Sequence, residues 1–257
     1  MFSVEQLAVE RGGRMIVRGI DLHLAAGYAL QIHGANGSGK STLLCALAGL
    51  LLPVKGKVCW HGADVRSQPQ RFRRDLSYMG HTNGVSDDLT VLENIRFARL
   101  LGAGRSTDNS TYRSHLNEGE VLKGAGLLEL LHTRLNRLSQ GQRRRVALAR
   151  VMLSAKPLWL LDEPAEALDA AAQGWLGVCI DAHMRAGGIV VSTTHRPLAT
   201  ASAHTRHLRL EGEADDWRDA GCHTPRTHSD LAQTDDDARH AGVLHSRIEP
   251  VPTGDWS

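Results

Sequence analysis

The sequence predicts an α/β fold with a mostly parallel sheet, an antiparallel β region at the N-terminus and an inserted helical region. Three observations carry this prediction. A glycine-rich segment separates a predicted strand at 28–33 from a proline-free, Leu/Ala-rich segment at 40–49 that favours a helix. Two continuous apolar segments, 158–161 and 188–194, are typical of strands covered on both faces. Strands that alternate with helices in this way form largely parallel, doubly wound sheets.

The length suits one large α/β domain, or a domain plus an appendage. The chain has 257 residues, of which 42% are hydrophobic, and this content supports a packed core. Residues 212–257 hold ten Asp and Glu against four Arg, a net charge of −6, which leaves +8 on residues 1–211. We expect a folded domain at 1–211 and an acidic, disordered tail at 212–257, where apolar periodicity fades. The basic body suits an anionic surface or an acidic partner, although an evenly solvated surface is the commoner explanation.

The chain carries no predicted targeting or membrane segment. The apolar run 43–54 contains Pro53 and is too short to span a bilayer, and the N-terminus lacks the order of a signal peptide. We therefore expect the protein in the cytoplasm. The four cysteines form no CxxC pair and predict reduced, mostly buried thiols, while the four histidines of the tail lack metal-ligand spacing.

The N-terminal 30 residues predict antiparallel strands, because short apolar runs are interrupted at Gly12-Gly13 and Ala26-Gly27. The segment 28–33 alternates apolar and polar residues, which predicts a strand with one buried face.

The loop that follows has the composition of a phosphate-binding site. Its glycines let the backbone wrap around an anion with N–H groups pointing inward, and the next helix adds the positive end of its dipole. Lys40 can reach the β- and γ-phosphates, and the Ser41 hydroxyl can bind Mg²⁺. The predicted nucleotide-phosphate site consists of Gly34, Ala35, Asn36, Gly37, Ser38, Gly39, Lys40, Ser41 and Thr42.

The middle of the chain changes character. Strands are predicted at 56–60 and 76–79, with an exposed basic cluster at 71–74 between them. Helical spacing of apolar residues at 89–101 and 116–131, around a polar loop at 102–112, predicts a helical insertion over about 84–150.

A strong helix start lies at the end of this insertion. Ser139 is a natural N-cap and Gln142 follows three residues later, which is the spacing of a capping box. The basic run Arg143 to Arg145 is expected on a solvated or dimer-facing surface rather than against nucleic acid.

Two acidic residues and a histidine follow the apolar strands. Asp162 ends the strand 158–161 at the edge where the phosphate loop lies, so its carboxylate is well placed to hold Mg²⁺. Glu163 can accept a proton from an attacking water. His195 follows the strand 189–194, where its N–H can contact the γ-phosphate or orient the water.

In these motifs the chain resembles the ATP-binding subunits of ABC transporters, which are P-loop NTPases, over about residues 2–211. The matching segments are the phosphate loop, the signature Leu138, Ser139, Gln140, Gly141 and Gln142, the Leu160–Pro164 segment, the D-loop with Asp169, and the switch histidine His195. The resemblance implies hydrolysis of ATP held between two chains, on the phosphate loop of one and the signature helix end of the other.

Three positions depart from the family pattern. Gln140 replaces the usual Gly or Ala of the signature, and His81 occupies the place of the Mg²⁺-binding glutamine of the Q-loop. Arg11 occupies the place of the aromatic residue that stacks on adenine; a guanidinium plane can also stack on a base.

Several segments together resemble one subfamily, the ATP-binding export subunits of cytochrome c biogenesis. They include Gly80-His81, the stretch 89–94, the long helix start 141–150, Leu158-Trp159 and the stretch 187–198. This resemblance implies a peripheral ATPase on the cytoplasmic face of the bacterial inner membrane, bound to integral membrane subunits, whose hydrolysis drives haem export or release of a haem-loaded chaperone. The alternatives are a subunit of another ABC importer or exporter, or a soluble ABC ATPase acting on ribosomes or DNA; no nucleic-acid partner is expected.

Overall fold

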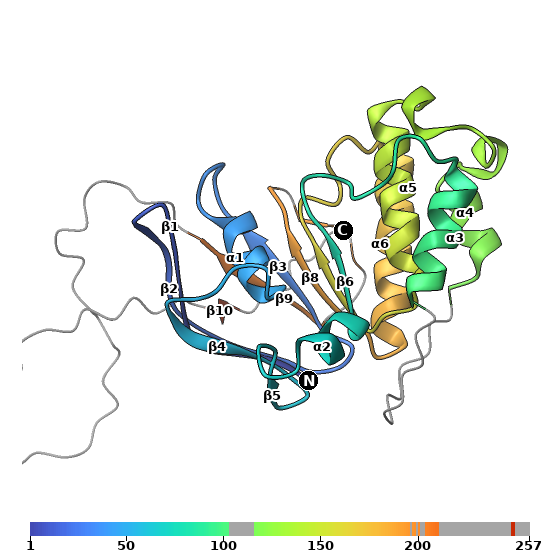
Figure 1. Ribbon diagram of the computed structural model, residues 1–257. Helices are drawn as coiled ribbons and strands as arrows, with labels where there is room; N and C mark the ends of the chain where they lie inside the picture. The colour runs from blue at the N-terminus through green and yellow to red at the C-terminus, as the bar shows by residue number, and fades with distance from the viewer. Residues whose placement is uncertain (103–115, 196, 199, 201–203, 211–247, 250–257) are drawn as a thin grey trace, which may run out of the picture.

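Two sheets enclose the helix that follows the glycine-rich loop, and a group of helices packs on the far side of the second sheet (Figure 1). The computed structural model describes residues 1–102, 116–195, 197–198, 200 and 204–210, together with the backbone of 248–249. The predicted polar loop at 102–112 lies almost entirely outside the described residues. The predicted tail at 212–257 lies outside them apart from the backbone of 248–249.

The first sheet is antiparallel and contains four strands within the described residues. In spatial order they are β2 (Arg14–Leu24), β1 (Phe2–Arg11), β4 (Lys55–Trp60) and β5 (Ala63–Asp64). Gly12 and Gly13 form the tight turn between β1 and β2, with φ of 62° and 76° that glycine adopts without strain. The predicted antiparallel region is therefore confirmed.

The second sheet is parallel except at one edge. Its order is β10 (Ile248–Glu249), β9 (Thr205–Arg209), β3 (Ala29–His33), β8 (Ile189–Thr193), β7 (Leu158–Leu161) and β6 (Leu76–Met79), and only β10 runs antiparallel to its neighbour. The prediction of one exposed face for β3 is wrong, because Gln31 is only 2% exposed. Its side-chain oxygen accepts from the Leu198 N–H at 3.2 Å, so the polar residue is satisfied inside the protein.

The helices divide between the two sides of this sheet. Helix α1 (Lys40–Leu47) lies between the sheets, and α3, α4, α5 and α6 stand together on the other side (Figure 1). Their bounds are α3 (Val91–Gly102), α4 (Glu118–Gly124), α5 (Gln140–Leu153) and α6 (Ala170–Arg185), with the short α2 (Pro69–Asp75) before β6 and 3₁₀ turns η1 (Leu128–Leu130) and η2 (Leu135–Arg137) before α5.

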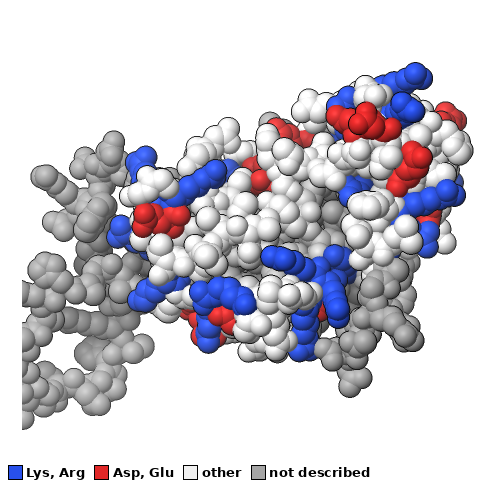
Figure 2. Space-filling view, viewed as in Figure 1, with Lys and Arg blue, Asp and Glu red and all other residues white. Residues whose placement is uncertain are grey.

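One sequence expectation for these helices needs correction, and another is confirmed. The continuous helix expected over 116–131 is divided into α4 and η1, because the chain turns at Gly126 with a φ of 64°. The basic cluster 71–74 lies in α2, which buries Phe72 and leaves its three arginines exposed. Figure 2 shows Lys and Arg side chains over this part of the surface.

Strand β7 lies between two hydrophobic clusters. Trp159 and Leu161 face the cluster formed with the helices α3 to α6, whereas Leu158 and Leu160 face the cluster around α1. All four side chains are at most 1% exposed, as the apolar pattern predicts for a strand covered on both faces. This packing fixes the position of the C-terminal end of β7, which Asp162 directly follows. No described helix is both long enough and apolar enough to cross a bilayer.

Candidate active site

The glycine-rich loop connects β3 to α1 and leaves no space for side chains at two of its glycines. A Cβ on Gly39, which has a φ of 91°, would lie 2.1 Å from Cγ2 of Ile16 in β2. A Cβ on Gly34 would lie 2.5 Å from Oγ of Ser38. Glycine is therefore required at both positions to bring the backbone N–H groups close together.

The lysine of the loop is buried against the backbone. Lys40 is 6% exposed, and its Nζ donates to the carbonyls of Gly34 at 2.9 Å and Ala35 at 3.0 Å. Nearby, Oγ of Ser38 is buried and has no hydrogen-bond partner among the described residues. The N-cap of α1 is Gly39, which supplies no side chain to the first turn. The loop thus offers a cation, an unpaired hydroxyl and an uncapped helix N-terminus, all of which suit a phosphate.

Asp162 brings the loop and two strands together. Its carboxylate is nearly buried, and Oδ1 accepts from the hydroxyls of Ser41 at 3.0 Å and Thr193 at 2.6 Å. Its backbone N–H donates to the carbonyl of Met79 in β6 at 2.7 Å. A buried carboxylate and a hydroxyl in contact form an oxygen-rich donor set of the kind that Mg²⁺ prefers.

Glu163 lies beside Asp162 in a left-handed backbone conformation. Its φ is 47°, which is uncommon for a residue other than glycine. The Glu163 N–H donates to Oγ1 of Thr193 at 2.9 Å. Its carboxylate Oε1 lies 3.0 Å from Nε2 of His195 and 3.7 Å from Nζ of Lys40. The structure therefore brings five of the predicted site residues into one cluster: Lys40, Ser41, Asp162, Glu163 and His195.

The signature segment stands on the helical side of the molecule, apart from α1 (Figure 1). Ser139 caps α5: its Oγ accepts from the Gln142 N–H at 3.2 Å, and the Gln142 side chain accepts from the Ser139 N–H at 2.8 Å. Gly141 packs so closely that a Cβ there would lie 2.8 Å from the Ala167 carbonyl. Within the signature, Leu138 is buried and Gln140 is exposed. The capping box expected from the sequence is thus present.

Three further predicted positions lie outside the five-residue cluster around Asp162. Asp169 caps α6 by accepting from the Ala172 N–H at 2.8 Å. Arg11 is exposed at the end of β1, opposite Arg14 across the hairpin turn. His81 is exposed between β6 and α3. Among the described residues, the side-chain hydrogen-bond partners of Asp162 are Ser41 and Thr193 rather than His81.

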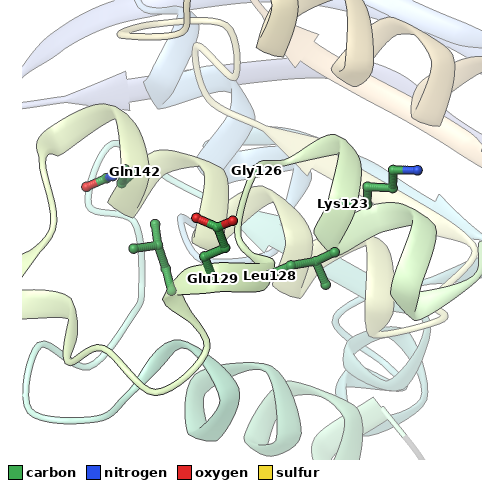
Figure 3. A pocket seen from close by; sticks show the side chains of 6 residues that line it. Lys123, Gly126, Leu128, Glu129 and Gln142 are labelled. Carbon is green, nitrogen blue, oxygen red and sulfur yellow. The ribbon is translucent and has the colours of Figure 1, made fainter.

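A surface pocket of about 400 Å³ borders the signature turn (Figure 3). It is lined by Lys123, Gly126, Leu128, Glu129, Leu130 and Gln142. None of these residues belongs to the cluster around Asp162, so the groups predicted to act on ATP lie outside this pocket.

Arg144 is a residue of the site whose position the sequence analysis missed. The basic run 143–145 was expected on a solvated or dimer-facing surface, and for Arg144 this is wrong, because it is only 5% exposed. Its Nη1 donates to Oδ1 of Asn83 at 2.8 Å, and its Nη2 donates to the carbonyls of Asp162 and Glu163. The signal was helical spacing: Arg144 lies one and two turns before Leu148 and Met152, both buried.

The pKa of Arg144 reflects its burial beside backbone carbonyls and nearby carboxylates. Loss of water lowers the pKa of its guanidinium, while the carboxylates of Glu166, Asp162 and Glu163 oppose that change. Because arginine keeps its charge in proteins, the buried cation is retained and its hydrogen bonds are charge-assisted. Thr193, which bridges Asp162 and the Glu163 N–H, was also missed; it lies within a predicted strand and no local pattern distinguishes it.

Comparison with known proteins gives a consistent family. The profile described as ABC transporter matches residues 17–166. The cytochrome c biogenesis ATP-binding export protein CcmA of Paraburkholderia xenovorans (strain LB400) is 60% identical over 221 residues, covering 82% of this chain and 97% of that protein. The protein of the same name from Dechloromonas aromatica (strain RCB) is 40% identical and covers 82% of this chain and 100% of that protein.

Solved structures agree at the level of the fold. The dimeric structure of MJ0796, described as a bacterial ABC transporter cassette, superposes with a TM-score of 0.67 at 25% identity, covering 82% of this chain and 95% of that chain. A dimeric post-hydrolysis state of the ATP-binding cassette MJ0796 with bound ADP and Pi also has a TM-score of 0.67, at 24% identity, covering 83% of this chain and 97% of that chain.

Proposed function

The chain belongs to the ATP-binding proteins of ABC transporters, as a relative of the cytochrome c biogenesis ATP-binding export proteins, and from this premise we propose which residues bind and cleave ATP and what the hydrolysis drives. The observation that carries the proposal is the cluster in which Asp162 and Glu163 meet Lys40 and Ser41 at the end of β7.

ATP binds on the phosphate loop, residues 34–42. Lys40 exchanges its two carbonyl partners for the β- and γ-phosphates, the loop N–H groups and the α1 N-terminus face the phosphate oxygens, and Ser38 supplies its unpaired hydroxyl. Arg11 stacks its guanidinium plane on the base, a contact that any purine can accept.

The residues around Asp162 fit a magnesium ion. Ser41 Oγ and Asp162 Oδ1 lie 3.0 Å apart and would hold the ion, with Asp162 acting directly or through water. His81 occupies the Q-loop position. When bound, the ion neutralises charge on the phosphates. Thr193 keeps its hydrogen bond to the same carboxylate and so fixes the direction in which Asp162 presents its oxygens.

Hydrolysis uses Glu163 as general base. Its carboxylate accepts the proton of the water that attacks the γ-phosphate, while His195, 3.0 Å away, contacts that carboxylate and orients the water or the phosphate. Lys40 stabilises the charge that develops on the phosphate oxygens.

The ATP-binding site is completed by a second copy of the chain. Ser139, Gln140, Gly141 and Gln142 of one chain, with Leu138 beneath them and Asp169 in the adjoining turn, face the nucleotide on the phosphate loop of the other. This arrangement is supported by the separation of α5 from α1 and by the dimeric state of the solved relatives.

The hydrolysis cycle serves integral membrane subunits of a cytochrome c maturation complex. The chain works as a peripheral subunit at the cytoplasmic face of the bacterial inner membrane, where it powers haem export or release of a haem-loaded chaperone. The support is the name shared by its relatives, cytochrome c biogenesis ATP-binding export protein.

A haem stain of c-type cytochromes tests this function in cells whose only copy carries Lys40→Ala. The expected result is loss of covalently bound haem while the cytochrome polypeptides are still exported. Normal haem attachment in cells that contain stable variant protein would overturn the role in cytochrome maturation and leave another ABC transporter as the alternative. Arg18→Gln, at an exposed position on β2, is the control.

A further inference from the structure

The guanidinium of Arg144 joins three segments that are distant in the sequence. It extends from α5, the helix that begins at the signature, and contacts both the loop after β6 and the turn after β7. The donor–acceptor distances are 2.8 Å to Oδ1 of Asn83, 2.5 Å to the Asp162 carbonyl and 2.6 Å to the Glu163 carbonyl. A side chain buried to this extent, with several charge-assisted bonds, holds its acceptors in a fixed geometry.

The Glu163 peptide is the part of the site that most needs such a restraint. Its φ of 47° is a conformation that an unrestrained glutamate rarely adopts, so the surrounding contacts must maintain it. Thr193 binds the N–H of Glu163, and Arg144 binds its carbonyl. Together they fix both sides of the residue and thereby the direction in which its carboxylate leaves the backbone.

The loop after β6 is tied to the same helix at two adjacent residues. Arg144 binds the Asn83 side chain, and Nη1 of Arg150, which follows Arg144 along α5, donates to the Gly84 carbonyl. The loop therefore reaches Glu163 through a single intervening side chain, that of Arg144.

We propose that Arg144 is a positioning residue that holds the Glu163 backbone in its left-handed turn and couples it to Asn83, so that a displacement of the 80–84 loop is transmitted to the general base. The inference rests on the proposed role of Glu163. It adds that the rate of hydrolysis depends on the Asn83–Arg144–Glu163 connection, whereas ATP binding does not.

Steady-state ATPase kinetics of the full-length chain test this coupling. In Arg144→Gln we expect kcat to fall about tenfold to a hundredfold, because a small misplacement of a catalytic group costs rates of that order, with KM for ATP changed less than about threefold. Asn83→Ala should lower kcat about tenfold by releasing one side of the guanidinium. The double variant should be no slower than Arg144→Gln, since both changes break one connection.

Arg145→Gln is the matched control. Arg145 lies on the same helix and also donates to a backbone carbonyl, that of Ala125, but within the helical side of the molecule. Its variant should keep kcat within about twofold of wild type. If Arg145→Gln lowers kcat as much as Arg144→Gln, or if Asn83→Ala leaves kcat unchanged, the proposal is overturned.

Two further measurements keep the result unambiguous. Should Arg144→Gln not fold, Arg144→Lys replaces it, because lysine keeps the charge but lacks the planar fork that spans Asn83 and both carbonyls; the same fall in kcat is expected, and a wild-type kcat contradicts the proposal. Lys40→Ala in the same assay tests the proposed function itself. Loss of turnover in Lys40→Ala together with normal turnover in Arg144→Gln refutes only the coupling.

Discussion

At the scale of single residues, the contacts of Glu163 suit the proposed role of a general base that activates water. Its carboxylate lies between a histidine and a lysine, and its backbone is held from both sides. We predict that Glu163→Gln binds ATP with near-normal affinity but lowers kcat at least about a hundredfold, because an amide cannot accept the proton. Equilibrium ATP binding and steady-state turnover measured on the same preparation check this.

Glu163→Gln is a conservative change, so we expect the variant to keep the wild-type fold. Glutamine keeps the size of the side chain and its acceptor oxygen, so the contact with His195 can persist. Turnover in Glu163→Gln within about tenfold of wild type would remove Glu163 from the role of general base. Glu120→Gln, at an exposed position on α4, is the matched control and should hydrolyse ATP normally.

The sequence predicted the residues of this cluster because each has a local pattern. Lys40 and Ser41 end a glycine-rich loop, and Asp162 ends a continuous apolar strand. Helical spacing indicates that Arg144 is buried, but neither Arg144 nor Thr193 has a local pattern that reveals its role, since their partners lie 18 to 61 positions away in the chain. Long-range hydrogen bonds of buried polar residues are a property of the packed fold and cannot be inferred from spacing alone.

At the scale of elements, the contact between α6 and β7 contains a buried histidine. The ring of His183 stacks on Trp159, with centroids 3.7 Å apart, and burial lowers the pKa of His183 from 6.5 to about 3. Between these pH values the unfolded chain binds a proton that the folded protein does not. Stability is therefore lost as the pH falls below 6.5, by about 1.4 kcal/mol per pH unit.

A comparison of variants isolates this contribution. We predict that between pH 7 and pH 5 the free energy of unfolding falls by about 2 kcal/mol more in the wild-type protein than in His183→Phe, which keeps an aromatic ring against Trp159. Urea titrations at the two pH values measure the difference. His23→Gln, at an exposed position, should follow the wild type; equal losses in wild type and His183→Phe contradict the prediction.

Element predictions succeeded where burial and chain pattern agreed. β7 is apolar throughout and is covered on both faces, and α5 begins at the expected capping box. They failed where tertiary partners decided the outcome. The polar Gln31 predicted a half-exposed β3, yet its side chain accepts a hydrogen bond from the Leu198 N–H inside the protein. The apolar spacing over 116–131 predicted one helix, but the chain turns at Gly126.

At the scale of the whole molecule, the elements that we propose bind ATP lie in two separate places. The phosphate loop lies at the sheet edge beside α1, while the signature turn lies at the end of α5 among the helices (Figure 1). The family resemblance implied that the loop and the signature of one chain serve different nucleotides, and their separation follows from how the helical group packs on the second sheet. Pairing with a second chain is the simplest way to place the phosphate loop of one chain opposite the signature turn of another.

Mixing two inactive variants tests that arrangement. Lys40→Ala removes the loop cation but keeps the signature, and Ser139→Arg blocks the signature but keeps the loop; alone, each should be inactive. In a mixed dimer, one of the two sites combines an intact loop with an intact signature. Random pairing makes half of the dimers mixed, so an equal mixture should regain about a quarter of the wild-type ATPase rate if sites act independently. No recovery after mixing, or normal turnover by Ser139→Arg alone, would show that a single chain forms the site, because only a shared site can be rebuilt from two damaged copies.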